Sequence, residues 1–288
     1  MKWSRLLAAA LSCGILMTGC AAEPKEETGS GQTETQTIVE SISENQFPKL
    51  GGCEALYFPG NLAAAAASKS SFAQAADMTA FTDTNKTAWE QLENGELDIV
   101  VAYAPDTETQ KRLEEKGFQM QQIGTDALVF LSGGTETRSL TVEQLLNAYH
   151  NQLEGWVSYS SAPNTDARLL FSRVMGTDSV GQTLTEGGET LTAACSHEEN
   201  TLCYASYLSL LAEGQPKNTT LIAVDGILPN AESILQTNSA GAYPLTVPYY
   251  AACRGDLQQD DPISILYQWM TSEAGAQWIA QTAFQTEE

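Results

Sequence analysis

The sequence predicts an α/β fold, in which strands and helices alternate along a chain of 288 residues. Hydrophobic residues make up 42% of the chain and charged residues 17%, enough for a sizeable core and too apolar for a disordered protein. The length allows one large or two mid-sized domains. Apolar runs such as LDIVVAY at 97–103 alternate with helical patterns, and strands separated by helices imply mostly parallel sheets with right-handed crossovers.

The N-terminus reads as an export signal. Lys2 and Arg5 precede an apolar run at 6–17, which is too short to span a bilayer. The small residues that follow lead into Cys20, and this arrangement resembles the bacterial lipoprotein signal, in which the chain is cut before a lipidated cysteine. We therefore expect residues 1–19 to be a signal peptide and Cys20 to carry the membrane anchor. The alternative is an ordinary signal peptide.

Residues 20–45 are expected to be the lipidated cysteine and a flexible tether, because the segment after Cys20 is rich in Glu, Thr, Gln and Gly without an apolar period. Export exposes the chain to an oxidising environment. Four cysteines then remain, and they allow three pairings. Cys195 and Cys203 could close a small loop, which would leave Cys53 with Cys253; free thiols are the alternative.

The first half of the body alternates as the fold class requires. Residues 55–58 carry a short strand signal, and 61–76 form an Ala-rich helical segment. Residues 84–94 place Ala, Trp and Leu on one face and stop at Gly95, a normal helix end. The run at 97–103 then predicts a strand buried on both faces.

The second half continues the alternation. The expected elements are a helix at 108–116, a strand at 127–131, a helix from 142, a strand at 220–224 and a C-terminal helix from 262. Thr141 and Gln144 form a capping box. Asp261 and Pro262 occupy the N-cap and first helical positions of the last helix.

Composition excludes several functions. The chain has 14 basic and 36 acidic residues and a net charge of −22. It therefore has too few Lys and Arg side chains to bind nucleic acid or to dock on an anionic membrane through a basic patch. Only His150 and His197 are available, which disfavours a metal site. No nucleophile elbow, zinc-protease motif, phosphate loop or dinucleotide fingerprint occurs, so we expect neither an enzyme nor a cofactor.

Six segments carry a family resemblance. In order they are GGCEALYF, WEQLENGELDIVVAYAP, LTVEQLLNAYHNQLEGW, VDGILPN, YPLTVPYYAACRGD and MTSEAGAQWI. Together they resemble the phosphate ABC-transporter substrate-binding proteins, across most of residues 46–283. The resemblance implies the type II periplasmic binding-protein fold, with two α/β lobes joined by two hinge strands. Transferred to this sequence, the resemblance implies a first lobe at 46–132 plus 243–288 and a second lobe at 133–242.

The resemblance also implies an anion site built from three loops and the N-termini of helices. The first loop, usually Gly-Ser-Thr, has Cys53 and Glu54 here, so a hydroxyl donor becomes a thiol and a carboxylate follows. The second keeps donors at Thr84 and Asn85.

The third loop, usually Arg-Pro-x-Asn-Ser-Gly-Ser-Gln, aligns with 161–168. Its arginine is missing and its Gly-Ser pair has become Asp-Ala, with Thr165 keeping a hydroxyl. Arg168 is a candidate for the missing charge. If Glu54 and Asp166 stood about 5 Å from a dianion, each unit-charge pair would cost roughly 3 kcal/mol at an effective dielectric of about 20. The sequence therefore predicts a degenerate anion site.

The sequence therefore predicts an extracytoplasmic, lipid-anchored, monomeric solute-binding protein that captures phosphate or another small polar ligand and serves ABC permease subunits. The alternative is a cell-surface lipoprotein that uses the same fold as a sensor or interaction module and has lost the anion site.

Overall fold

The computed structural model describes residues 41–179, 181–183, 190–236 and 239–285. The predicted signal peptide, Cys20 and most of the predicted tether lie outside these residues. Within them, no helix is both long and apolar enough to cross a bilayer.

The strands form one mixed sheet in the order β2-β1-β3-β10-β4-β8-β6-β7, with β9 beside β4 and β5 beside β9. Their bounds are β1 Leu50–Cys53, β2 Ala80–Asp83, β3 Ile99–Tyr103, β4 Phe118–Gly133, β5 Arg138–Leu140, β6 Val157–Ser160, β7 Gln182–Thr183, β8 Thr201–Ser206, β9 Thr219–Val224 and β10 Thr246–Arg254.

The helices lie between these strands in sequence. Their bounds are α1 Tyr57–Ser68, α2 Phe72–Asp77, α3 Asn85–Asn94, α4 Thr107–Glu115, α5 Val142–Tyr149, α6 Asp166–Met175, α7 Leu191–Cys195, α8 Tyr207–Glu213, α9 Ala231–Leu235, α10 Pro262–Thr271 and α11 Glu273–Phe284, with short 3₁₀ turns η1 Glu44–Gln46 and η2 Glu54–Leu56.

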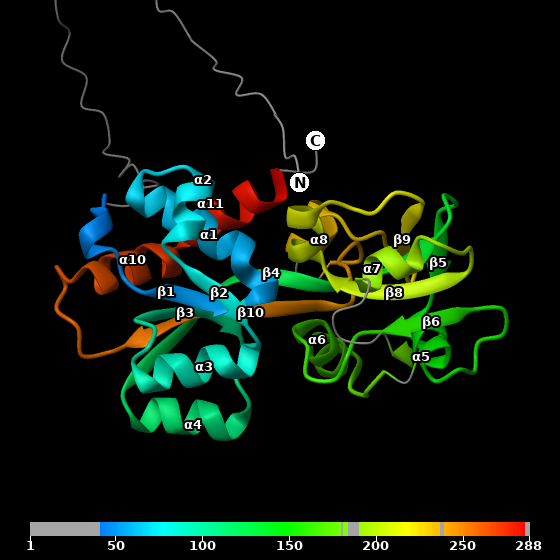
Figure 1. The fold of residues 1–288 in the computed structure, drawn as a ribbon, viewed down its shortest axis with the longest axis horizontal. Coiled ribbons are helices and arrows are strands. Elements are labelled where there is room, and N and C mark those ends of the chain that lie inside the picture. Colours follow the sequence, from blue (N-terminus) through cyan, green and yellow to red (C-terminus); the bar gives the residue numbers. More distant parts are fainter. Residues whose placement is uncertain (1–40, 180, 184–189, 237–238, 286–288) are drawn as a thin grey trace, which may run out of the picture. The chain divides into compact units, whose positions relative to one another are not determined.

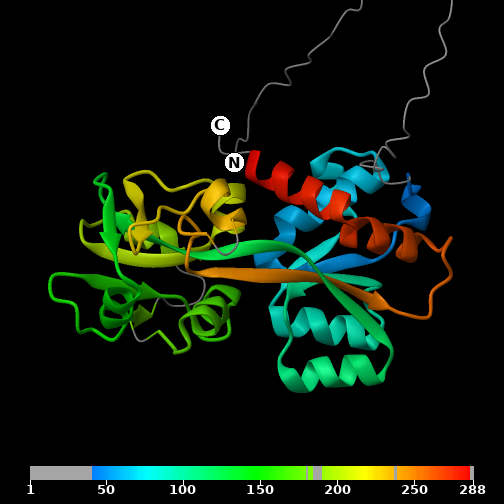
Figure 2. The same ribbon diagram turned by 180° about the vertical axis from the view of Figure 1, so that it is seen from behind.

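The long strand β4 divides the sheet into two sections. Its first part pairs antiparallel with β10 as far as Ala127, and from Leu128 onward it pairs with β8 and then β9. We call β1, β2, β3, β10 and the first part of β4 the first sheet section, and the strands on the other part of β4 the second sheet section. The two long strands run side by side in both views (Figures 1 and 2).

Helices cover both faces of the first sheet section, with α3 and α4 on one face and α1, α10 and α11 on the other (Figure 1). This explains why β3 is buried at every position and reads as a continuous apolar run. The second sheet section packs around four aromatic rings whose centroids lie 4.8–6.5 Å apart, namely Phe130, Tyr149, Phe171 and Tyr204.

The predicted α/β class is confirmed, and so are most of the predicted helix starts and ends. Thr84 caps α3, which ends at Gly95 with φ 76°, and the Thr141 capping box opens α5. Asp261 caps α10, whose first residue is Pro262.

One local prediction is wrong. Residues 55–58 are helical, because the strand β1 lies just before them and the chain turns at once through η2 into α1. The predicted helical segment 61–76 is also broken, since Lys69 adopts φ 55° between α1 and α2.

Candidate functional site

The start of α3 supplies the first wall of the site. Thr84 is the N-cap, and its hydroxyl oxygen accepts a 3.3 Å hydrogen bond from the Thr87 N–H. Asn85, the first residue of the helix, is 9% exposed and its N–H has no partner inside the helix. That N–H donates instead to Asp166 Oδ1 at 2.7 Å.

The loop after β1 supplies the second wall. β1 ends at Cys53, whose side chain is fully buried, and burial together with the nearby Asp166 carboxylate raises the pKa of the thiol well above its ordinary value. Glu54 follows as the first residue of η2 and is exposed. The predicted thiol is therefore enclosed beside Asp166, whereas the Glu54 residue is open to solvent.

The start of α6 supplies the third wall. Thr165 is the N-cap and accepts from the Arg168 N–H at 3.3 Å, so its hydroxyl is used locally. Asp166 is the first helical residue. Burial raises the pKa of its carboxyl group, and the Glu54 charge adds to the rise. The N–H groups of Asn85 and Ala55 and the Cys53 thiol partly offset this by stabilising the carboxylate.

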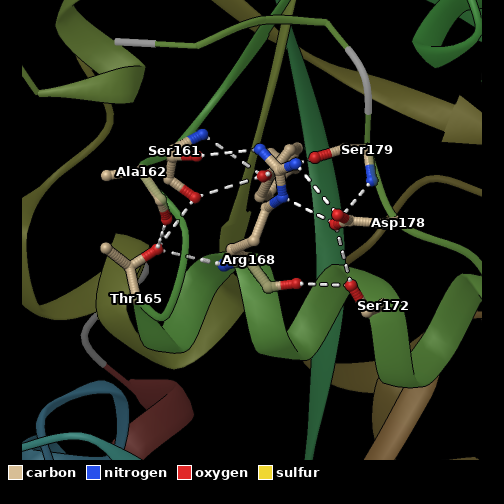
Figure 3. A network of polar contacts seen from close by, with 8 residues as sticks. Ser161, Ala162, Thr165, Arg168, Ser172, Asp178 and Ser179 are labelled. Atoms are coloured by element: carbon tan, nitrogen blue, oxygen red, sulfur yellow. Dashed lines mark hydrogen bonds and ion pairs between the residues drawn. The ribbon is translucent and has the colours of Figure 1, made fainter. Parts of the chain in front are cut away.

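The Arg168 guanidinium is engaged by Asp178 and by the Ser161 carbonyl (Figure 3). Its guanidinium makes a two-point ion pair with Asp178, with Nε–Oδ1 at 2.6 Å and Nη2–Oδ2 at 3.1 Å, and Nη1 donates to the Ser161 carbonyl at 3.1 Å. Its side chain is only 12% exposed. The predicted substitute for the missing arginine therefore links the segment before α6, at Ser161, to the segment after it, at Asp178.

The four cysteines of the body are free, buried thiols in the structure. The pairing of Cys53 with Cys253 is not made, because β3 lies between β1 and β10 and Cys253 is opposite Ile99, level with Leu50. Two strand spacings amount to about 10 Å, beyond the Cα separation that a disulfide tolerates.

Cys195 and Cys203 are, by contrast, neighbours. A hydrogen bond between the two thiols lowers the pKa of Cys195, whereas burial raises the pKa of Cys203. Their pairing stays a prediction. No group of three or more histidine, cysteine or acidic side chains suited to a metal ion occurs among the described residues.

A cavity of about 630 Å³ opens beside the Asn85–Asp166 contact. Its lining comes from α3 and its N-cap, from the loop after β3 and the start of α4, and from α6 and the loop before it. The lining residues are Thr84, Asn85, Lys86, Thr87, Trp89, Pro105, Asp106, Thr109, Asn164, Leu169 and Arg173. The Arg173 guanidinium crosses from α6 to donate to the Ala104 carbonyl at 2.6 Å. A volume of this size suits a small molecule with a few polar groups.

Two important residues escaped the sequence prediction. Arg173 lies beyond the recognisable third loop, and only its spacing of two helical turns from Asp166 places it on the same side of α6. Asp126 is a fully buried carboxylate in β4, where the chain passes from one sheet section to the other. Its one signal was a lone acid beside the apolar run at 127–131.

The architecture is that of the type II periplasmic binding proteins: α/β, with the central sheet flanked by helices. No protein-family model matches the chain, and no curated protein matches it in sequence.

Solved structures do match. A phosphate ABC transporter substrate-binding protein from Clostridium perfringens, with bound phosphate, has a TM-score of 0.61 at 16% identity, covering 82% of this chain and 97% of that one. An ABC-type phosphate transport receptor from Vibrio cholerae gives 0.60 at 14%, with the same coverage. PstS from Borrelia burgdorferi gives 0.51 at 14%, covering 83% and 97%. These similarities establish the fold; the first of the three is named as a substrate-binding protein and the second as a transport receptor.

Proposed function

We propose that this protein is an extracytoplasmic solute-binding lipoprotein without catalytic activity, which captures a small polar solute between two lobes. The lobes would be 46–132 plus 243–288 and 133–242, joined by β4 and β10. The observation that carries the proposal is the cavity of about 630 Å³, whose lining comes from α3, α4 and the loop after β3 on one side and from α6 and the loop before it on the other. Closure of two lobes on a solute is the hinge motion expected of such an arrangement.

The anchor would be the lipid on Cys20, downstream of the signal peptide 1–19. Two acyl chains give durable membrane attachment without a transmembrane helix. A Cys20→Ala variant is expected to leave the membrane fraction and to lose incorporated palmitate. ABC permease subunits would be the partners, and the binding protein would act as a monomer.

The binding test is a thermal-shift screen of oxyanions, amino acids, amines and sugars on the purified protein, since a ligand that binds only the folded state raises the melting temperature. Leu169→Trp would fill the cavity, and Leu235→Trp is the matched control, because both leucines are 40% exposed and Leu235 lies on α9. A stabilising solute should lose its effect in Leu169→Trp and keep it in Leu235→Trp. The absence of any stabilising solute would contradict the proposal.

A second function is favoured by the Asn85–Asp166 hydrogen bond. A protein side chain already satisfies a donor that an anion would use, as expected of a cell-surface lipoprotein that keeps the fold as a sensor or interaction module. Under this alternative the screen finds no solute, and the partner is a membrane sensor or another surface protein.

A further inference from the structure

Two buried thiols lie side by side in the second sheet section. Cys195 ends the short helix α7, and Cys203 lies in the middle of β8. Helix α7 packs against β8 and β4, and both cysteine side chains are fully buried. The cavity at the start of α3 is lined by other residues, so the proposed solute binding does not use this pair.

Two contacts place the Cys195 sulfur next to Cys203. The Cys195 thiol lies 3.4 Å from the carbonyl oxygen of Leu131, the residue of β4 that pairs with Cys203 of β8. The same sulfur lies 3.3 Å from the Thr201 hydroxyl oxygen. Thr201 and Cys203 are two positions apart in one strand, so their side chains point to the same face of the sheet. The Cys195 sulfur is therefore on the face to which the Cys203 side chain points.

The segment 195–203 is already closed on itself by hydrogen bonds. The Thr201 hydroxyl lies 2.7 Å from the Cys195 carbonyl oxygen and 2.8 Å from the Glu198 carbonyl oxygen. Gly133 lets the segment approach β4, since a methyl group there would lie 2.5 Å from the Cys195 carbonyl oxygen. The ends of the segment are thus held together without a covalent bond, and a disulfide between them asks for little backbone movement.

The two thiols differ in acidity in the way that suits thiol–disulfide exchange. The hydrogen bond with Cys203 lowers the pKa of Cys195, and the Thr201 hydroxyl and the Gly133 N–H add to the lowering. Burial raises the pKa of Cys203 well above its ordinary value. Because the thiolate is the attacking species, Cys195 is the thiol that reacts first and Cys203 the one that follows.

We propose that Cys195 and Cys203 form a disulfide in the exported protein, which closes the segment 195–203 and holds α7 on β8 and β4. The inference rests on the proposed extracytoplasmic location, where thiols are oxidised, and not on solute capture. Both sulfurs are buried in the folded chain, so the bond forms while the exported chain is folding.

The oxidant is a second disulfide, carried by a thiol oxidoreductase or by oxidised glutathione. The Cys195 thiolate attacks one sulfur of that disulfide, which forms a mixed disulfide and releases one oxidant thiol. Cys203, as a thiolate, then attacks the Cys195 sulfur and releases the second oxidant thiol. The two protons and two electrons of the cysteine pair end on the oxidant, which leaves as two thiols.

The first test counts thiols in the full chain recovered from the membrane fraction. N-ethylmaleimide in denaturant should modify Cys53 and Cys253 before reduction, and should modify Cys195 and Cys203 only after reduction, as read by mass spectrometry of the peptides. In Cys195→Ala, Cys203 should be modified without reductant. The count on the wild type needs no variant, so a variant that fails to fold leaves the test intact.

The second test is the effect of dithiothreitol on the melting temperature. A disulfide stabilises by restricting the unfolded chain, so the reductant should lower the melting temperature of the oxidised wild type by about 5 °C or more. The double variant Cys195→Ala/Cys203→Ala should melt at the same temperature with and without it. Cys253→Ala is the matched control: it removes another buried thiol, from β10, and should keep the wild-type response.

Refolding with glutathione separates the thiol pair from the location of the protein. The purified, reduced wild type is unfolded and then refolded with oxidised and reduced glutathione, and the same two thiols should disappear from the count. Four modifiable thiols after this refolding, or in the membrane-bound chain, would overturn the inference. So would a peptide map that joins Cys53 or Cys253 to either member of the pair.

The outcomes also separate this inference from the proposed function. If a solute stabilises the protein while all four thiols stay modifiable, the receptor stands and the disulfide fails. If the disulfide forms while no solute stabilises the protein, the disulfide stands and the receptor fails. If the chain stays in the cytoplasm but closes the same pair on refolding with glutathione, the pairing stands and the proposed location fails.

Discussion

The Tyr103 hydroxyl donates a 2.7 Å hydrogen bond to the buried carboxylate of Asp126, which ties β3 to the point where β4 changes sheet section. The same carboxylate accepts from the Ser206 hydroxyl at 2.6 Å and from the N–H groups of Ala127 and Leu208 at 2.7 and 3.1 Å. One side chain thus joins β3, β4 and the start of α8.

Removal of this carboxylate should destabilise the protein. Asp126→Ala leaves four buried donors without their acceptor, and we expect a loss of about 3 kcal/mol in the free energy of unfolding, measured by urea denaturation. Burial raises the pKa of the Asp126 carboxyl group, which means that its ionised form is costly to bury. Asp126→Asn retains one acceptor oxygen and removes that charge, so it should lose less unfolding free energy than Asp126→Ala. A loss below about 1 kcal/mol in Asp126→Ala would contradict this role.

Asp166 should make stability depend on pH in a defined direction. Because burial raises its pKa above the ordinary 3.8, its contribution is fully present below that value and is lost as the pH rises through the folded-state pKa. Asp166→Asn should therefore gain stability relative to the wild type between about pH 4 and pH 7, measured by chemical unfolding at each pH.

The control for that experiment has the opposite sign. Hydrogen bonding from the Thr109 N–H lowers the pKa of Asp106, so its contribution is present above 3.8 and is lost as the pH falls. Asp106→Asn should be the less stable protein at pH 7 and approach the wild type in acid. Parallel pH profiles for Asp106→Asn and Asp166→Asn would refute the assignment.

The Arg168–Asp178 pair should show measurable coupling. Asp178 is 64% exposed, so solvent screens the pair, yet its geometry is bidentate and Arg168 is largely buried. A double-mutant cycle with alanine at both positions should give a coupling of about 1 kcal/mol. The exposed Lys111–Glu115 pair, with its atoms 3.8 Å apart, should give a value near zero in the same cycle. Equal coupling in the two pairs would argue against this linking role.

Gly124 should tolerate no side chain. A methyl group there would lie 2.2 Å from the Tyr249 ring, where β4 and β10 pair across a register shift. Gly124→Ala is expected to cost about 2 kcal/mol or more, read from the denaturation midpoint. Gly241→Ala, which has only a side-chain oxygen at 3.3 Å, is the control and should change stability little.

Local signals in the sequence determined much of the fold. The N-caps Thr84, Thr141 and Asp261 start their helices as predicted, because a side-chain oxygen and a nearby backbone N–H are enough to fix a helix start. The run at 97–103 contains the fully buried strand β3, since burial on both faces leaves no polar alternation. The strand prediction for residues 55–58 failed because a short run of apolar residues suits a strand and a buried helix equally.

Only the tertiary structure decided how the site is used. The sequence named Cys53, Asn85, Asp166 and Arg168 as candidates from loops far apart in the chain, but it carried no information on which would face one another. Contacts over such separations depend on how the sheet is paired and how helices pack on it. Packing brought the Asp166 carboxylate to the Asn85 N–H at the start of α3 and directed the Arg168 guanidinium to Asp178.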